Sequence, residues 1–237
     1  EILAYDNMPA EIISSTLFTS PVYAANVFPV DEDVVLEYVS AMTGDQDTTV
    51  TASVYLLDEG AKLPTDGILL ETATDTFRFA GYHRLDLSSN LLLPAGSRIS
   101  IVVIESVPVA DGTKYALVNT GALSETGVKA YNQSQEDENR KLKRYCVGVV
   151  NPGESFISLE AGEWTDWSDA IAEIAKVGTN ANMAYDNLPI KAYVYPRTEV
   201  EKVHNLSEKI PAPGGEAAVC PEDGYMLLDV AGGTQNP

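Results

Sequence analysis

The stretch Phe77–Ile104, FRFAGYHRLDLSSNLLLPAGSRISIVVI, decides the predicted fold. Polar and apolar residues alternate from His83 to Ser88, a period of two that is typical of a strand with one solvent-facing side. Pro94–Gly96 then predicts a turn, because proline presets the first turn position and glycine accepts a positive φ. Ile99–Ile104 is apolar and β-branched apart from Ser100, which predicts a central strand buried on both faces.

The rest of the chain repeats this pattern of short apolar segments and turns. Strands are predicted over residues 23–30, 34–42, 50–57, 68–72, 115–119, 146–150, 155–159 and 190–195. One short helix is predicted over Trp167–Val177, with Asp166 or Ser168 as its cap and Gly178 at its end. Many short strands with one helix indicate an all-β protein, an antiparallel β-sandwich. We expect five side chains to share one core: Leu85, Leu87, Ile99, Ile101 and Val103.

Two segments depart from this pattern. Residues 121–145 are strongly polar and are expected to form a solvated excursion or a charge-paired hairpin. The composition changes after Arg197, where prolines and glycines mark a linker. We therefore expect a sandwich domain over 1–197 and a C-terminal extension or linker over 198–237, with one strand at Tyr225–Val230. Because the chain begins at Glu1, it is expected to be a mature or excised piece of a longer protein.

The composition bounds the class of protein. The chain has 237 residues, 45% of them hydrophobic, so it can bury a core and is globular. Its net charge of −20 argues against a nucleic-acid partner and against anionic membranes, since both need a cationic face. No apolar run is long enough to cross a bilayer. Cys146 and Cys220 are too few for a disulfide scaffold, and one bridge and two free thiols both remain open.

No catalytic arrangement is visible in the sequence. Cys146 lies in an expected strand, His83 in another and His204 in the tail, so nothing predicts a thiolate paired with an imidazole. Zinc-ligand spacing, a phosphate-binding glycine loop and a Gly-x-Ser-x-Gly elbow are also missing. We assign no catalytic residue, no metal-binding residue and no cofactor. A structural calcium ion would need oxygens from several acidic turns, and Asp31–Asp33, Asp45–Asp47 and Asp186–Asn187 could supply them.

A glycan site would need an exposed aromatic ring beside carboxylate or amide groups, because aromatic faces cover the apolar face of a sugar. The ligand-binding candidates are Trp167, Asp166, Asp169 and Tyr131. We expect Trp164 to point inward and fill the end of the core. Trp167, three residues later, would then present its ring to solvent near Asp166 and Asp169. A helix that tucks Trp167 under itself is the alternative.

Seven short segments occur in an order that matches a known family. They are Tyr5–Asp6, Ala25–Phe28, Phe79–Leu87, Leu93–Gly96, Gly153–Phe156, Trp164–Asp166 and Asn187–Tyr193. In this order the chain resembles the lectin-like domain that accompanies papain-like (C1 family) cysteine peptidases exported by clostridia and related bacteria. The departures are Glu154 in place of the usual glutamine, the excursion at 121–145, the helix after Trp167 and everything after residue 197.

The resemblance implies a jelly-roll-like or lectin-like sandwich with no active site of its own. It implies a non-catalytic accessory domain of a secreted or cell-surface peptidase, whose partner is the papain-like peptidase domain elsewhere in the same chain. The expected ligand is glycan or cell-wall material. The alternative is a structural spacer that packs on the protease domain and positions it.

Overall fold

The structure, a computed structural model, describes residues 1–5, 12–134, 144, 147–160, 162–178, 180–197, 209–211 and 217–219. The chain divides into two compact units, Glu1–Tyr195 and Pro196–Pro237. In the second unit, β14 (Lys209–Pro211) pairs antiparallel with β15 (Ala217–Val219). The strand predicted over Tyr225–Val230 lies outside the described residues.

The elements of the first unit are mostly strands. In chain order they are β1 (Ile2–Leu3), β2 (Ile12–Phe18), β3 (Tyr23–Pro29), β4 (Val34–Thr43), β5 (Thr48–Leu57), β6 (Gly67–Phe77), β7 (Gly81–Leu93), β8 (Arg98–Val109), β9 (Gly112–Leu123), α1 (Glu125–Ser134), β10 (Ser155–Glu160), β11 (Glu163–Asp166), α2 (Trp167–Val177), β12 (Met183–Tyr185) and β13 (Ile190–Pro196). Among the described residues, no helix is long and apolar enough to span a membrane.

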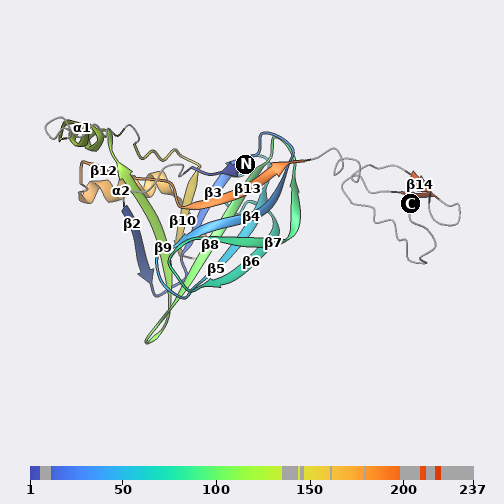
Figure 1. Ribbon diagram of the computed structural model, residues 1–237, viewed down its shortest axis with the longest axis horizontal. Helices are drawn as coiled ribbons and strands as arrows, with labels where there is room; N and C mark the ends of the chain where they lie inside the picture. The colour runs from blue at the N-terminus through green and yellow to red at the C-terminus, as the bar shows by residue number, and fades with distance from the viewer. Residues whose placement is uncertain are drawn as a thin grey trace. The chain divides into compact units, whose positions relative to one another are not determined.

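Two sheets face each other in this unit (Figure 1). The smaller sheet has the strand order β1-β13-β4-β7, and the larger has β11-β10-β3-β8-β5-β6. β9 extends the larger sheet, because it pairs with β8 beyond the beginning of β3 and also with β2 and β12. The predicted all-β antiparallel sandwich is confirmed, and its jelly-roll connectivity stays a prediction.

β8 lies at the centre of the larger sheet, between β3 and β5. Four of the five side chains predicted to share a core belong to the main core cluster and are at most 3% exposed: Leu85 of β7, and Ile99, Ile101 and Val103 of β8. The fifth, Leu87, is partly buried against the same core. Val102 points to the other face of β8 and is also buried, in a second cluster. The prediction of a central strand covered on both faces is therefore confirmed.

The turn at Pro94–Gly96 connects the two sheets rather than two neighbouring strands. β7 belongs to the smaller sheet and β8 to the larger. The backbone N–H of Ser97 donates to the oxygen of Pro94 at 3.2 Å, and Gly96 has a φ of 79°, a conformation that favours glycine. This predicted turn sets the beginning of β8 at Arg98.

A second helix, α1, lies where the hairpin or excursion was expected, so the prediction of a single helix is wrong. The Ser124 hydroxyl caps it by accepting a hydrogen bond from the N–H of Gly127 at 3.0 Å. Gly127 allows a close contact, because a Cβ at this position would lie 2.0 Å from the backbone oxygen of Asn182. Glycine lowers helix propensity, and here tertiary packing requires it inside a helix.

Helix α2 has the predicted bounds. The carboxylate of Asp166 caps it by accepting from the N–H of Ser168 at 2.9 Å, and Gly178 lies just after its end. By contrast, residues 147–150 have no regular secondary structure, so this part of the strand predicted over 146–150 is wrong. Its backbone is held in another way, since Gly148 N donates to the oxygen of Leu123 at 3.1 Å. Cys146 and Cys220 lie outside the described residues.

Candidate functional site

A groove of about 380 Å³ lies on the outer face of the larger sheet, away from the core between the sheets. Its floor is apolar and consists of the buried side chains Val27, Leu57 and Phe156, from β3, β5 and β10. They belong to the second hydrophobic cluster, with Ala25 and Val102. An apolar outer face of a sheet needs a cover to keep it from water. Here a loop and a short hairpin cover it in part and leave the groove between them.

One wall of the groove is the loop between β5 and β6. The carboxylate of Asp66 holds this loop by accepting from the backbone N–H groups of Lys62 at 3.2 Å and Leu63 at 3.0 Å. Arg98, at the beginning of β8, donates from Nη2 to the oxygen of Ala61 at 2.6 Å. The side chains of Lys62, Leu63 and Arg98 therefore lie together on this wall.

Trp164 of β11 forms the other wall. It is half-buried and lies against Tyr23, with ring centroids 6.4 Å apart and tilted by 59°. Its indole N–H has no hydrogen-bond partner in the part of the chain that the structure describes, and it is not buried. An aromatic ring held on one side, with an unused donor, is suited to contact the ring of a ligand.

Asp166 lines the groove and also joins three pieces of structure. Its Oδ2 accepts from the N–H of Gly153 at 2.6 Å, and its Oδ1 accepts from the N–H and hydroxyl of Ser168 at 2.9 and 2.7 Å. These bonds tie the turn before β10 to β11 and to the first turn of α2. Asp166 was predicted as a ligand-binding residue, and the structure gives it a structural role at the rim of the groove.

Trp167 does not lie at this groove. It is only 3% exposed, its Nε1 donates to the oxygen of Asp186 at 3.0 Å, and its ring meets Tyr185 edge-on at 5.5 Å. The expectation that Trp167 faces solvent while Trp164 fills the core is therefore wrong, and the alternative of a tucked Trp167 holds. The reason is strand alternation: Trp164 and Asp166 share the outer face of β11, and Trp167 falls on the inner one.

The two remaining candidate residues also lie away from the groove. Asp169 is exposed in the first turn of α2, where a negative charge complements the helix dipole. Tyr131 lies on α1, with the guanidinium carbon of Arg144 4.9 Å from its ring centroid. Of the groove residues, Trp164 was expected in the core, and Lys62 and Arg98 were not predicted. For Trp164 the alternation through β11 is a usable signal, whereas no local pattern links Lys62 to Arg98.

The family motifs meet in a buried polar network rather than at the groove. The Asn26 amide donates to the oxygen of Leu188 at 2.8 Å. The Ser155 hydroxyl lies 2.7 Å from the amide oxygen of Asn26 and 2.7 Å from that of Asn187. Asn187 in turn donates to the carboxylate of Glu154 at 2.9 Å. The motifs containing these residues therefore serve the fold, because they fix the segment before β13 onto β3 and β10.

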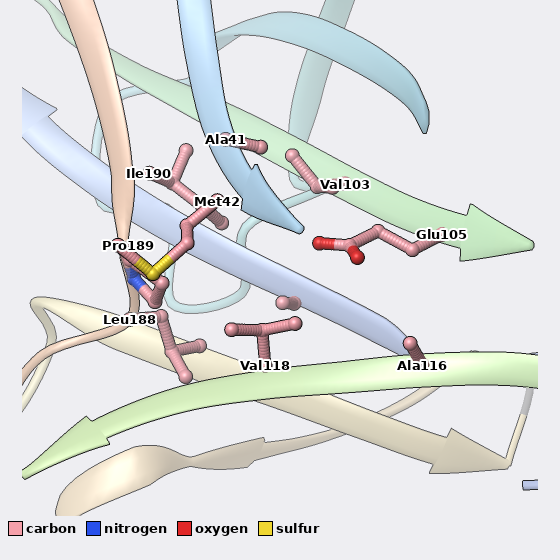
Figure 2. A pocket seen from close by; sticks show the side chains of 10 residues that line it. Ala41, Met42, Val103, Glu105, Ala116, Val118, Leu188, Pro189 and Ile190 are labelled. Atoms are coloured by element: carbon pink, nitrogen blue, oxygen red, sulfur yellow. The ribbon is translucent and has the colours of Figure 1, made fainter. Parts of the chain in front are cut away.

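A second, much smaller hollow lies between the sheets (Figure 2). Its volume of about 10 Å³ leaves room for one water molecule at most. Glu105 of β8 points into it among apolar side chains that include Met42 and Val118 (Figure 2). Burial, with a smaller effect of the negative charge of Asp45, raises the pKa of Glu105 to about 8. Its Oε2 has no hydrogen-bond partner among the described residues. This hollow is too small for a sugar.

The described residues hold no group of three or more His, Cys, Asp or Glu side chains placed to bind a metal ion. The structural calcium ion stays a prediction. His83 is occupied in another way, since its Nε2 lies 2.7 Å from the oxygen of Phe79 and its ring stacks on Phe77. Cys146 and His204 lie outside the described residues.

Comparison with known proteins agrees with this architecture. Two solved structures of the cysteine protease Cwp84 match it. The first, of the clostridial protease after propeptide cleavage, is 20% identical, with a TM-score of 0.55, over 83% of this chain and 40% of that chain. The second contains the cysteine protease and lectin-like domains of Cwp84, a surface-layer-associated protein of Clostridium difficile. It is 21% identical, with a TM-score of 0.51, over 77% of this chain and 33% of that chain.

This chain thus spans less than half the length of either solved structure, and at such identities the likeness shows a shared fold alone. No curated protein matches the chain. A family model described as a lectin-like domain matches residues 5–194, which is most of the sequence and nearly all of the first unit. The family resemblance predicted from the ordered motifs is confirmed, and the chain belongs to the lectin-like domain family.

Proposed function

We propose that this domain is a non-catalytic glycan-binding module that accompanies a cysteine peptidase domain in a longer protein, secreted or at the cell surface. The peptidase part is supported by the second similar structure, which contains the cysteine protease and lectin-like domains of one protein, Cwp84. The glycan part is supported by the groove beside Trp164. In this proposal the chain contributes recognition or positioning, and the peptide-cleaving residues lie in the other domain.

The single observation that carries the glycan proposal is the setting of Trp164. Its ring lines a groove of about 380 Å³, and small-molecule sites range from about 300 to 1,000 Å³. The apolar floor can take the C–H face of a sugar ring, while the free indole N–H can donate to a hydroxyl group. Trp164 is also anchored by Tyr23 and the β10–β11 hairpin, so little ordering cost accompanies binding.

The test measures binding of the chain to an array of bacterial cell-wall glycans and to purified peptidoglycan. Trp164→Ala should abolish binding, because the ring that contacts the sugar is gone. Tyr82→Ala is the matched control, since Tyr82 is an aromatic residue of β7 that is 44% exposed and does not line the groove. Binding by the parent and Tyr82→Ala, with loss in Trp164→Ala, supports the proposal. Equal binding by all three chains would contradict it.

The spacer role gives a different result in the same experiment. A domain that only positions a protease should bind none of the glycans, even when it is folded. If this chain then co-purified with its separately expressed peptidase domain, that result would support the spacer role. The proposal also expects no peptide cleavage by this chain alone, and cleavage that disappears in Cys146→Ala would overturn the accessory role.

A further inference from the structure

We propose that the groove selects an acidic saccharide, whose anionic group lies between Lys62 and Arg98 while a sugar ring rests on Trp164. This inference depends on the proposed glycan-binding function and adds the chemical class of the ligand. The anionic group would be a carboxylate, as in a uronic acid, or a phosphate ester on the sugar. Both offer several acceptor oxygens to a cationic pair.

The distribution of charge is the first argument. The chain has 35 acidic and only 15 basic residues, so a random patch of its surface is negative. Two of the few cations nevertheless lie on one wall of this groove, and Asp166 is the single carboxylate among the described residues that line it. Neither Lys62 nor Arg98 forms an ion pair with any residue, as far as the described part of the chain extends.

The geometry of Arg98 is the second argument. One nitrogen of its guanidinium donates to the oxygen of Ala61 at 2.6 Å. Because Lys62 directly follows Ala61, this bond holds the half-buried side chain of Arg98 beside Lys62. Its other N–H donors have no partner among the described residues. Guanidinium presents these donors in a fixed plane that matches two oxygens of a carboxylate or a phosphate. The arginine is thus oriented before a ligand arrives.

The nearby carboxylates already have other partners. Asp66 accepts from two backbone N–H groups of its own loop. Asp166 accepts from Gly153 and from the backbone and hydroxyl of Ser168. These are charge-assisted hydrogen bonds, which fix the orientation of both carboxylates. Neither carboxylate forms an ion pair with Lys62 or Arg98 in the described part of the chain, and an anionic ligand would supply the counterion.

The test compares acidic oligosaccharides with their uncharged counterparts by calorimetric titration. The probes are tetramers of galacturonate, mannuronate and glucuronate, the methyl ester of each, and mannotetraose with and without a 6-phosphate. We expect at least one acidic form to bind about fivefold or more tightly than its uncharged counterpart, since a charge-assisted contact contributes on the order of 1 kcal/mol. Preference for uronates identifies the carboxylate as the ligand group, and preference for the phosphorylated mannan identifies the phosphate.

Variants separate charge from ring contact. Lys62→Ala and Arg98→Gln should each reduce binding of the preferred acid about fivefold and leave its uncharged form unchanged. Glutamine keeps an N–H donor without the charge, and circular dichroism would check that each variant is folded. Lys129→Ala removes one exposed cation from α1, away from the groove, and should change nothing.

The outcomes distinguish the two proposals. If every uncharged form binds as tightly as its acid, and Trp164→Ala abolishes both, the glycan function stands and selection by charge is wrong. If acid preference survives in both Lys62→Ala and Arg98→Gln, the assignment to this pair is wrong. If no probe binds in a way that depends on Trp164, both proposals fail.

Discussion

The indole N–H of Trp167 donates to the backbone oxygen of Asp186 at 3.0 Å, and this bond pins the beginning of α2 to the segment between β12 and β13. Trp167 is also part of the main core, with 3% of its surface exposed. Trp164, three residues earlier, belongs to the smaller cluster on the outer face. The two tryptophans thus have separate roles, one in stability and one at the groove.

Trp167→Ala should therefore destabilise the domain strongly. Removing a buried aromatic ring costs about 3–5 kcal/mol, and here a partly buried hydrogen bond is lost as well. Trp164→Ala should cost less than half as much, because that ring is partly exposed and lies outside the main core. Guanidinium unfolding followed by circular dichroism measures both variants. A larger loss in Trp164→Ala than in Trp167→Ala would contradict the assignment of roles.

Truncation of the central strand tests the main core. Ile101 is fully buried at the middle of β8, between β3 and β5. Ile101→Ala should lower the free energy of unfolding by about 2–5 kcal/mol, because it leaves a cavity in a closed core. Ile68→Ala is the control, since Ile68 of β6 is 63% exposed. The core assignment would be wrong if Ile101→Ala lost less than about 0.5 kcal/mol, the range typical of surface changes.

The motif network makes a separate prediction about buried polar groups. Asn187→Ala leaves Ser155 and Glu154 without a shared partner, which should cost about 1–3 kcal/mol of unfolding free energy. In a double-mutant cycle with Ser155→Ala, the two losses should be less than additive, because both changes break the same contact. Gln133→Ala removes an exposed amide from α1 and should have no effect. Additive losses in the cycle would show that the two residues do not interact.

Glu105 should give the domain a stability that depends on pH. Its pKa is raised from 4.5 to about 8 in the folded chain, so the folded state keeps a proton that the unfolded state has released. The contribution of Glu105 to the free energy of unfolding is therefore fully present below pH 4.5 and is lost as the pH rises toward 8. The group facing it with like charge is Asp45, which itself accepts a hydrogen bond from the Ser15 hydroxyl at 2.6 Å.

Glu105→Gln removes this titration while keeping the shape of the side chain. Relative to the parent, the variant should gain unfolding free energy as the pH rises, on the order of 5 kcal/mol between pH 4.5 and pH 8. Urea titrations from pH 5 to pH 8 measure the slope of each chain. Equal slopes for parent and variant would show that Glu105 does not hold its proton in the folded state.

Some of these features follow from sequence and others do not. The strand at Ile99–Ile104, its turn and helix α2 depend on local period, proline and capping, so the sequence predicts them. Helix α1 was not predicted because glycine has a low helix propensity. Gly127 is required there by the close contact with the backbone of Asn182, which the local sequence does not reveal. The groove could not be predicted because folding brings together Lys62 of the β5–β6 loop, Arg98 of β8 and Trp164 of β11. Spacing along the chain carries no information on that contact.

The most direct test of the glycan proposal uses Trp167→Phe, which leaves Trp164 as the single tryptophan and keeps an aromatic ring beside Tyr185. Its fluorescence is recorded during titration with each glycan that binds the parent chain. We expect the emission of Trp164 to shift to shorter wavelength and to saturate with the affinity measured for binding, because a sugar ring displaces water from the indole. Unchanged emission at saturating glycan, with Trp167→Phe still folded and still bound, would contradict a site at Trp164.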